Sequence, residues 1–340
     1  MSMEHRLPFG VMPDGRPVEE LILTDGPLSC SILTYGGALR TLTVPDREGR
    51  TVDIVLGYDT LKDYLVQDKY LGALIGRYAN RIGSSRFFLD GKEYPLPSND
   101  GANHLHGGNL GFDKQVWTVQ SLTSSSATLT LTSPDGEEGY PGELKVSVTY
   151  TLRNRALEIS YRAQSSKTTL CNLTNHAYFN LSGHASGLID AQWFQLPSSR
   201  YTPVDTELIP TGDIVSVEGT AMDLTTPQPL GKREYDHNWV IDGWDGSLRL
   251  AARAWSLDTG IRMEVLTTLP GVQFYTGNFL GGSPKGKDGA PYAKHWAFCL
   301  ETQYFPDSPN HRNFPSAKLA AGEIYESKTV YRFETGEEFL

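Results

Sequence analysis

The sequence predicts an all-β fold of the sandwich type, and two observations carry that prediction. The 340-residue chain contains 34 glycines and 20 prolines, which interrupt many short runs of strand-forming residues. Within these runs, apolar residues alternate with polar ones, as is typical of strands that bury one face. Residues 61–74 are the exception, because their composition favours a short helix.

The expected strands follow one another along the chain. Several lie within residues 20–58, separated by turn residues at 25–27, 36–37 and 45–46. Alternating segments then occupy residues 127–132, 144–152 and 156–163, and the last two are joined by a hairpin turn at 153–155. Residues 247–256 and 261–269 form another expected hairpin. The loop at 281–291 is rich in Gly, Lys and Asp and is expected to be mobile.

The charge balance restricts the class of partner. The chain carries 30 basic and 40 acidic side chains, which gives a net charge of −10. A nucleic-acid partner requires a basic surface, so it is disfavoured. The phosphate-binding pattern G-x-x-x-x-G-K-[ST] does not occur, which leaves nucleotide chemistry without support. A neutral small ligand fits this composition best.

Cysteine usage and hydropathy indicate a cytoplasmic protein. Cys30, Cys171 and Cys299 are odd in number and lack C-x-x-C spacing, so we expect buried free thiols in a reducing compartment. The start of the chain, MSMEHRLPFG, lacks the apolar segment of a signal peptide. No apolar run approaches the ~20 residues that span a bilayer, so no membrane association is expected.

The segment Thr174–Gly183, with the sequence TNHAYFNLSG, is the centre of the functional interpretation. His176, Tyr178 and Asn180 occupy alternate positions, so on an extended strand their side chains would share one face. An imidazole, a phenol and an amide on one face suit a hydroxyl-rich ligand. The alternative is a core histidine packed beside aromatic neighbours.

Two earlier clusters contain further polar groups. The first, GRYANRI at residues 76–82, contains Arg77, Asn80 and Arg81 and is either a solvated turn or a loop that aims a guanidinium at a ligand oxygen. The second, HLHGG, contains His104 and His106, which would share one face of a strand. The Glu that a cupin-type metal site needs shortly afterwards is missing. A turn with one packed and one exposed histidine is the alternative.

Three later residues complete the set. Asp236 lies in YDHNWV, where the Trp239 indole would offer an apolar platform for a sugar; an Asx turn entering a strand is equally compatible. Gln273 lies in an expected strand and could point toward a ligand. Glu301 interrupts an apolar strand, where a carboxylate is costly unless it is paired or functional. The alternative for Glu301 is a solvent-facing position on an edge strand.

These candidates are hydrogen-bonding and acid–base groups. No Ser or Cys nucleophile has an obvious partner, so a Glu with a His indicates proton transfer without a covalent step. If Glu301 and His176 are close, each should stabilise the charged form of the other, which would keep Glu301 anionic and His176 protonated.

The motifs together resemble those of a known family. GRYANRI, HLHGG, TNHAYFNLSG, YDHNWV, PGVQFYTGN and LETQYFPD are similar to the signature segments of the aldose 1-epimerases, the galactose mutarotases, and they come in the same order over roughly residues 30–330. The resemblance implies one large antiparallel β-sandwich domain over residues 1–340, with a sugar in an open cleft across one sheet. It also implies interconversion of the α and β anomers of free aldohexoses such as galactose and glucose, without a cofactor or a metal.

The resemblance assigns roles to individual residues. Glu301 matches the general base that takes the proton from the anomeric hydroxyl, and His176 matches the general acid that protonates the ring oxygen. The ring then opens, the C1–C2 bond rotates, and closure reverses both transfers. The remaining matches are sugar-binding residues: Asn80, Arg81, His106, Tyr178, Asp236 and Gln273. His104 is given no role.

Several alternatives stay open at this point. A hexose-6-phosphate epimerase would need a basic phosphate pocket, for which only Arg77 and Arg81 lie close together in the sequence. A non-catalytic sugar-binding module on the same fold would bind without turnover. A monomer and a homodimer are both compatible with the sequence, and so are galactose, glucose, xylose and arabinose as the preferred sugar.

Overall fold

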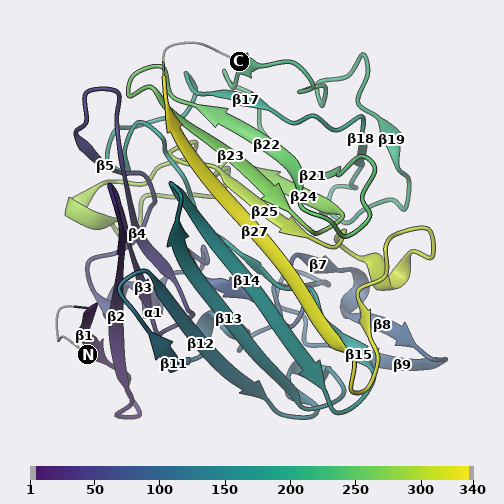
Figure 1. Cartoon of the computed structure of the whole chain (residues 1–340). Coiled ribbons are helices and arrows are strands. Elements are labelled where there is room, and N and C mark those ends of the chain that lie inside the picture. Colours follow the sequence, from purple (N-terminus) through teal and green to yellow (C-terminus); the bar gives the residue numbers. More distant parts are fainter. Residues whose placement is uncertain (1–4, 337–340) are drawn as a thin grey trace.

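The computed structural model describes residues 5–336, so residues 1–4 and 337–340 of the expected domain lie outside the described part. Strands dominate the chain, and the ladders between named strands are antiparallel (Figure 1). The predicted all-β class is therefore confirmed.

A long, twisted sheet forms one layer of the molecule (Figure 1). Its nine strands, in spatial order, are β11 (Thr118–Leu122), β12 (Ser126–Ser133), β13 (Leu144–Arg153), β14 (Ala156–Ser165), β27 (Ile324–Thr335), β23 (Ile261–Thr267), β22 (Arg249–Trp255), β17 (Trp193–Gln195) and β20 (Gln228–Pro229). The predicted hairpins β13–β14 and β22–β23 are both present. At the first of them, Asn154 and Arg155 adopt φ values of 50° and 59°, which match the right-handed twist of the strands they join.

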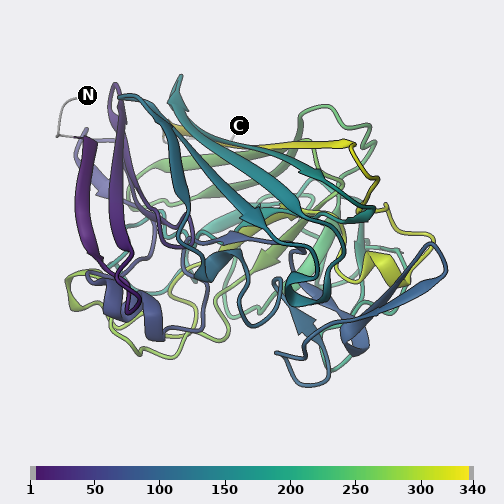
Figure 2. The same ribbon diagram turned by 90° about the horizontal axis from the view of Figure 1, so that it is seen from below.

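Two five-stranded sheets pack with this layer. The N-terminal sheet contains β1 (Arg6–Val11), β2 (Pro17–Asp25), β3 (Leu28–Leu33), β4 (Leu39–Pro45) and β5 (Thr51–Asp53). The other, which we call the site sheet, has the order β19 (Val215–Ser216), β18 (Arg200–Thr202), β21 (Asp236–Val240), β24 (Gly271–Tyr275) and β25 (Cys299–Gln303). In the view from below, the long teal and yellow strands run along the top of the molecule, and the purple N-terminal strands stand at its left side (Figure 2).

Short two-stranded ladders complete the fold. They pair β6 (Leu74–Ile75) with β16 (Thr174–Asn175), β7 (Arg81–Ile82) with β10 (His104–Leu105), β8 (Arg86–Leu89) with β9 (Lys92–Pro95), and β15 (Thr169–Leu170) with β26 (Lys318–Leu319). The second ladder joins the GRYANRI and HLHGG motifs, and the first pairs the start of TNHAYFNLSG with the two residues that precede GRYANRI.

Side-chain alternation on β25 decides which residues can reach a ligand. Leu300 belongs to the apolar core, and its carbonyl accepts a hydrogen bond from the Tyr331 hydroxyl of β27 at 3.3 Å. The hydroxyls of Thr302 and Thr329 meet at 2.5 Å in the same interlayer space. Because successive side chains point to opposite faces of a strand, Glu301 must point away from the long sheet.

The predicted helix over residues 61–74 is only half right. Helix α1 spans Leu61–Val66 and starts at Thr60, whose hydroxyl accepts a hydrogen bond from the Asp63 N–H at 3.3 Å. The helix ends at Val66 because the backbone of Gln67 is extended (ψ 153°), and further on Tyr70 and Gly72 have left-handed φ values of 57° and 70°. Residues 67–73 instead turn back toward the middle of the molecule.

The loop 281–291, expected to be mobile, is fixed at one point. Lys287 is buried, and its ammonium donates to Asp53 Oδ2 at 2.5 Å and to the Arg40 carbonyl at 2.9 Å. The three cysteines are buried free thiols, as expected. Among the described residues, no helix has both the length and the apolar character needed to cross a membrane.

Candidate active site

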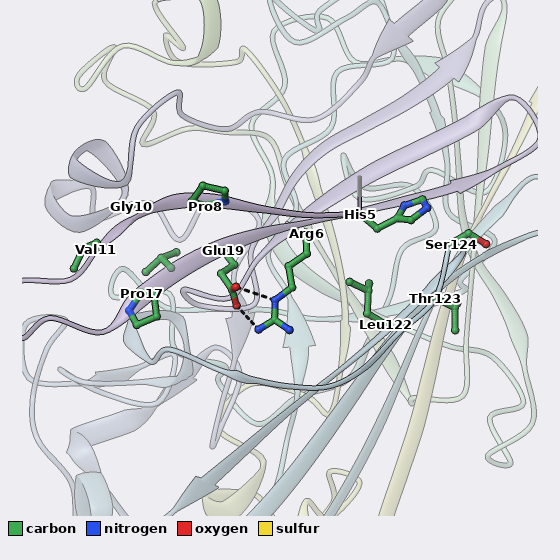
Figure 3. A pocket seen from close by; sticks show the side chains of 11 residues that line it. His5, Arg6, Pro8, Gly10, Val11, Pro17, Glu19, Leu122, Thr123 and Ser124 are labelled. Carbon is green, nitrogen blue, oxygen red and sulfur yellow. Dashed lines mark hydrogen bonds and ion pairs between the residues drawn. The ribbon is translucent and has the colours of Figure 1, made fainter. Parts of the chain in front are cut away.

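Two cavities differ sharply in chemistry. One, of about 620 Å³, lies between β1, β2 and the turn after β11 (Figure 3). Its Arg6 and Glu19 side chains pair with each other at 2.6 Å, which leaves mainly apolar walls. The other, of about 320 Å³, contains all the predicted site residues except Gln273: Asn80, Arg81, His106, His176, Tyr178, Asp236 and Glu301. This second cavity, which we call the polar cavity, is the candidate active site.

The site sheet supplies the floor of the polar cavity. Asp236 on β21, Tyr275 on β24 and Glu301 on β25 lie on its outer face, and Asp236 is directly opposite Tyr275 in the register. Trp239 is three positions from Asp236, so it faces the core instead and is fully buried there. The predicted indole platform for the sugar is therefore wrong.

Gln273 lies on the same face of the site sheet as Glu301 and Tyr275, but it does not line the cavity. It is the cross-strand neighbour of Glu301, and its amide donates to Asp236 Oδ1 at 2.7 Å. Gln303 in turn contacts Gln273 at 3.4 Å. These buried amides lie beside the Asp236 carboxylate, and the hydrogen bond from Gln273 holds it in place.

The structure brings His176 and Glu301 together. His176 Nε2 lies 3.7 Å from Glu301 Oε1, and both side chains are almost fully buried. The other imidazole nitrogen, Nδ1, contacts the Cys299 thiol at 3.5 Å. Glu301 Oε2 is buried and has no hydrogen-bond partner among the described residues. Such an oxygen can accept a proton or a hydrogen bond from a bound ligand.

The expected charge state of this pair needs correction. Burial raises the pKa of Glu301 well above its usual value; the Asp236 carboxylate adds to the increase and Arg81 opposes it. Burial also lowers the pKa of His176 to about 4. Desolvation thus outweighs the attraction between the two groups, which favours a neutral carboxyl and a neutral imidazole over the expected ion pair. The pair still shares one proton near neutral pH.

Asn80 determines the tautomer of His106. The Asn80 backbone N–H donates to His106 Nδ1 at 3.1 Å, and the backbone N–H of His106 donates to the Asn80 carbonyl at the same distance. A neutral His106 must therefore carry its proton on Nε2. Burial lowers its pKa well below the ordinary value, aided by His176 and Arg81. His106 is accordingly a neutral hydrogen-bond donor.

Arg81 connects the two acidic walls of the cavity. Its Nε donates to Asp100 Oδ2 at 2.7 Å, and its Nη1 lies 4.0 Å from Asp236 Oδ2. The Asn80 side chain accepts a hydrogen bond from the Arg81 N–H at 2.8 Å, which fixes the start of β7. Arg81 can therefore present its remaining donors in a constant direction.

The prediction of a shared face for His176, Tyr178 and Asn180 is partly wrong. β16 ends at Asn175, so these residues do not continue a regular strand. The rings of His176 and Tyr178 stack 5.0 Å apart in the cavity. Asn180 is fully buried, and its amide donates to the carbonyls of Gly187 and Trp296. Asn180 is thus a structural residue.

Two other sequence candidates lie outside the cavity. His104 Nδ1 contacts the Pro97 carbonyl at 2.8 Å and its Nε2 contacts the Tyr140 hydroxyl, because the chain turns at His106 (φ 53°) and separates the two histidines. The expectation that the histidines share a face is wrong, and neither ring is exposed. Arg77 donates to the Ser133 and Pro134 carbonyls in a buried site, so it cannot join Arg81 in a basic pocket.

Sequence reasoning missed several residues that line the polar cavity: Asp68, Lys69, Tyr70, Asn99, Asp100, Leu105, Tyr275 and Phe279. Tyr275 was detectable, since it is two positions from Gln273 in the same strand and shares its face. Residues 68–70 were not considered as site residues because the sequence placed them in the expected helix. Asp100 was not detectable, because its pairing with Arg81 depends on loop geometry.

His106, His176 and Glu301 also resemble a metal-ligand set, with ligand atoms within 4.8 Å of one another. A metal on His106 Nε2 would move the imidazole proton to Nδ1, where it would face the Asn80 N–H donor. The donor set therefore fits a metal poorly.

We expect that incubation with EDTA followed by buffer exchange leaves the activity unchanged. Loss of activity that Zn²⁺ or Mn²⁺ restores would contradict this reading.

Comparison with known proteins was made on sequence and on structure. A family model described as "Aldose 1-epimerase" matches residues 19–332. The chain is 49% identical to a galactose mutarotase of Bos taurus over 336 residues, covering 96% of this chain and 98% of the relative. It is 36% identical to an aldose 1-epimerase of Escherichia coli, covering 94% and 96% of the two chains.

Solved structures agree with these matches. A GalM/aldose epimerase homologue from C. elegans superimposes with a TM-score of 0.88 at 31% identity, over 93% of this chain and 98% of the other. A galactose 1-epimerase from Lactobacillus acidophilus gives a TM-score of 0.84 at 26% identity, over 97% and 98% of the chains.

Proposed function

Because this chain belongs to the aldose 1-epimerase family and interconverts the anomers of aldoses, we propose that His176 and Glu301 perform the two proton transfers of that reaction in the polar cavity. The substrate is a free aldohexose such as galactose or glucose. The observation that carries the proposal is the buried Glu301 carboxyl, with one oxygen 3.7 Å from His176 Nε2 and the other without a hydrogen-bond partner in residues 5–336.

The first step brings Glu301 and His176 into the protonation states that the reaction needs. An anomeric hydroxyl that donates to the partnerless Glu301 Oε2 favours the carboxylate form, because a hydrogen bond to the charged form lowers a pKa. Arg81 acts in the same direction. The single proton of the pair then moves from Glu301 to His176 Nε2, so that Glu301 becomes the base and His176 the acid.

Ring opening uses both groups at once. The O–H bond of the anomeric hydroxyl breaks and its proton goes to Glu301. The C1–O5 bond breaks, its electron pair stays on O5, and O5 takes the proton from His176 Nε2. The open-chain aldehyde rotates about C1–C2, and attack of the O5 hydroxyl on the other face of C1 returns both protons. Each proton transfer is expected to contribute ~10²–10⁴-fold.

The remaining cavity residues hold the sugar. Arg81 and Asp236 offer a donor and an acceptor to ring hydroxyls, and Gln273 keeps Asp236 oriented. His106, as a neutral Nε2–H donor, is suited to an oxygen of the sugar, and Asn80 keeps it in that tautomer. Tyr178, stacked on His176, forms part of the apolar wall.

Polarimetry of freshly dissolved α-galactose or α-glucose tests the activity. Catalytic amounts of protein should accelerate the decay of optical rotation to the same equilibrium value. An unchanged decay with several aldoses, together with measurable sugar binding, would favour a non-catalytic sugar-binding module.

A hexose-6-phosphate should be a poorer substrate than the free hexose. The cavity contains three carboxylates, on Asp68, Asp100 and Asp236, and the neutral Glu301 carboxyl, against the cations of Arg81 and Lys69, and Arg77 is occupied elsewhere. A phosphate dianion would be repelled by this acidic surface. We expect kcat/KM to be at least about tenfold lower for glucose 6-phosphate than for glucose, equivalent to ~1.4 kcal/mol. Equal values would revive the phosphorylated-sugar alternative.

The dependence of kcat/KM on pH follows from the two pKa shifts. The pair gains a second proton at His176, whose pKa is about 4, and loses its only proton at the raised pKa of Glu301. Activity should therefore rise as pH increases through about 4, stay level through neutrality, and fall above the raised Glu301 pKa. Rates are corrected for spontaneous mutarotation. An acid limb centred near 6.5, the ordinary imidazole value, would contradict this assignment.

We further propose that one chain, folded as a single domain, suffices for activity in the cytoplasm. The polar cavity is built from one chain, and a common core includes residues from Leu21 to Phe333. Three buried free thiols suit a reducing compartment. Size-exclusion chromatography at assay concentrations, combined with activity of the monomer fraction, tests the first part.

A further inference from the structure

Tyr70 covers both histidines of the polar cavity. Its ring centroid lies 4.7 Å from that of His106 at an interplanar angle of 59°, and 5.8 Å from that of His176 at 26°. The two imidazoles are 5.2 Å apart and nearly perpendicular. One aromatic side chain therefore contacts two groups of the site at once.

The backbone around Tyr70 is tied to the backbone of His176. The Tyr70 carbonyl accepts from the Ala73 N–H at 3.0 Å and closes a turn. Within that turn, the Gly72 N–H donates to the His176 carbonyl at 3.0 Å, and the His176 N–H donates to the Ala73 carbonyl at 2.8 Å. The turn and the histidine are thus one hydrogen-bonded unit.

Tyr70 also adopts a costly conformation. Its φ of 57° lies in the left-handed region, which bulky residues rarely occupy. Such conformations persist where the surrounding structure requires them, and they gather at functional sites. Helix α1 has already ended at Val66, where Gln67 is extended, and the left-handed turn that follows directs the aromatic ring of Tyr70 into the cavity.

The ring, rather than the hydroxyl, connects Tyr70 with the histidines. Within residues 5–336 the structure shows no hydrogen bond from the Tyr70 hydroxyl. The side chain is half-buried and lines the cavity. Removal of the hydroxyl alone should therefore leave the contacts with both imidazoles in place.

We propose that the Tyr70 ring is a positioning group, which holds the His106 and His176 imidazoles in their productive orientation and keeps water off them. This inference rests on the proposed proton-transfer role of His176. A missing ring would leave a space beside both imidazoles large enough to admit water and to allow rotation. Misplacement of a catalytic group by ~1 Å can cost ~10²-fold in rate.

The environment of His176 makes this role measurable. Burial is the main cause of its lowered pKa, so admission of water should move that pKa back toward the ordinary value. The other titratable groups that face His176 stay in place when Tyr70 is changed. They are Glu301, His106, Tyr178, Tyr275 and Cys299, with Asp236 and Arg81 acting on Glu301.

Three variants test the proposal by polarimetry with galactose. Tyr70→Ala should lower kcat by about 10- to 100-fold, the range expected for a displaced catalytic group. It should also move the acid limb of kcat/KM upward from about 4 toward 6.5. Tyr70→Phe should restore kcat to within about threefold and return the acid limb to its original position. Tyr94→Ala removes a half-buried tyrosine that stacks on Phe87, away from the cavity, and should leave both quantities unchanged.

The outcomes separate this inference from the proposed function. An inactive parent protein would overturn the proposed function. An active parent with a Tyr70→Ala variant of equal kcat and an unmoved acid limb would overturn the role of the ring. If Tyr70→Ala does not fold, Tyr70→Leu, which keeps apolar bulk but not the flat ring, takes its place, with the same expected loss of kcat and a smaller movement of the acid limb. Activity of Tyr70→Phe as low as that of Tyr70→Ala would also overturn it.

Discussion

Replacing Glu301 by glutamine should lower kcat by ~10³-fold or more while the variant still binds aldose. The amide has nearly the same shape as the carboxyl group, so the register with Gln273 and the packing on β25 should persist. It cannot accept the anomeric proton, and it cannot pass a proton to His176 at 3.7 Å. Polarimetry measures turnover, and isothermal titration with galactose measures binding.

A matched variant controls for the loss of a negative charge. Glu264→Gln, on β23, breaks ion pairs with Arg253 and Arg332 on the long sheet and should leave kcat within about twofold, as is usual for surface substitutions. Activity of Glu301→Gln close to that of the parent would remove Glu301 from the mechanism. Loss of binding together with turnover would show that Glu301 holds the sugar rather than moving its proton.

Replacing His176 by asparagine should have a comparable effect on kcat. Asparagine can occupy the region near Cys299 that His176 Nδ1 now contacts at 3.5 Å, but it offers no basic atom at the position of Nε2. The ring oxygen of the sugar would then receive no proton, and a loss of ~10²–10⁴-fold is expected. Stopped-flow or conventional polarimetry over a range of protein concentrations measures the residual rate.

The double variant distinguishes a shared mechanism from two separate roles. Because the two groups exchange one proton, removal of the second partner should cost little once the first has gone. His237→Asn is a suitable control, since His237 lies on the opposite side of β21 from Asp236 and outside the polar cavity. Additive losses in the double variant would mean that Glu301 and His176 act independently.

The parts of the fold with strong local signals were predictable. The hairpins β13–β14 and β22–β23 have regular alternation and turn residues, and the structure contains both. The helix was predicted too long because its last turns read as helical in the sequence, whereas the backbone at Tyr70 and Gly72 is left-handed. Long-range hydrogen bonds to His176 stabilise that turn, and no local pattern reveals them.

The candidate site illustrates a different limit. Residue type and strand position were enough to select Glu301, because a carboxylate in an apolar strand is unusual. Asp236 was selected from its neighbours in YDHNWV, for which an Asx turn was an equal alternative. The Trp239 prediction was wrong because positions three apart on a strand face opposite ways, so Trp239 cannot share a face with Asp236. The spacing in the sequence was enough to show this. The role of Asp100 depends on where a loop carries its side chain, and the sequence does not contain that information.

The charge state of the acid–base pair could not be predicted from residue types. Attraction between a carboxylate and an imidazolium favours the ion pair, while burial favours the neutral forms. Only the structure shows that both groups are nearly inaccessible to water, so that desolvation dominates. The pair is therefore neutral, and its one titrating proton lies on Glu301 instead of His176.

A crystal structure of the Glu301→Gln variant soaked with galactose tests the central claim most directly. The account predicts one sugar in the polar cavity, with its anomeric hydroxyl within about 3.2 Å of residue 301 and its ring oxygen at a similar distance from His176 Nε2. A sugar seated with C1 turned away from both side chains, or bound only in the apolar cavity beside β1 and β2, would contradict it.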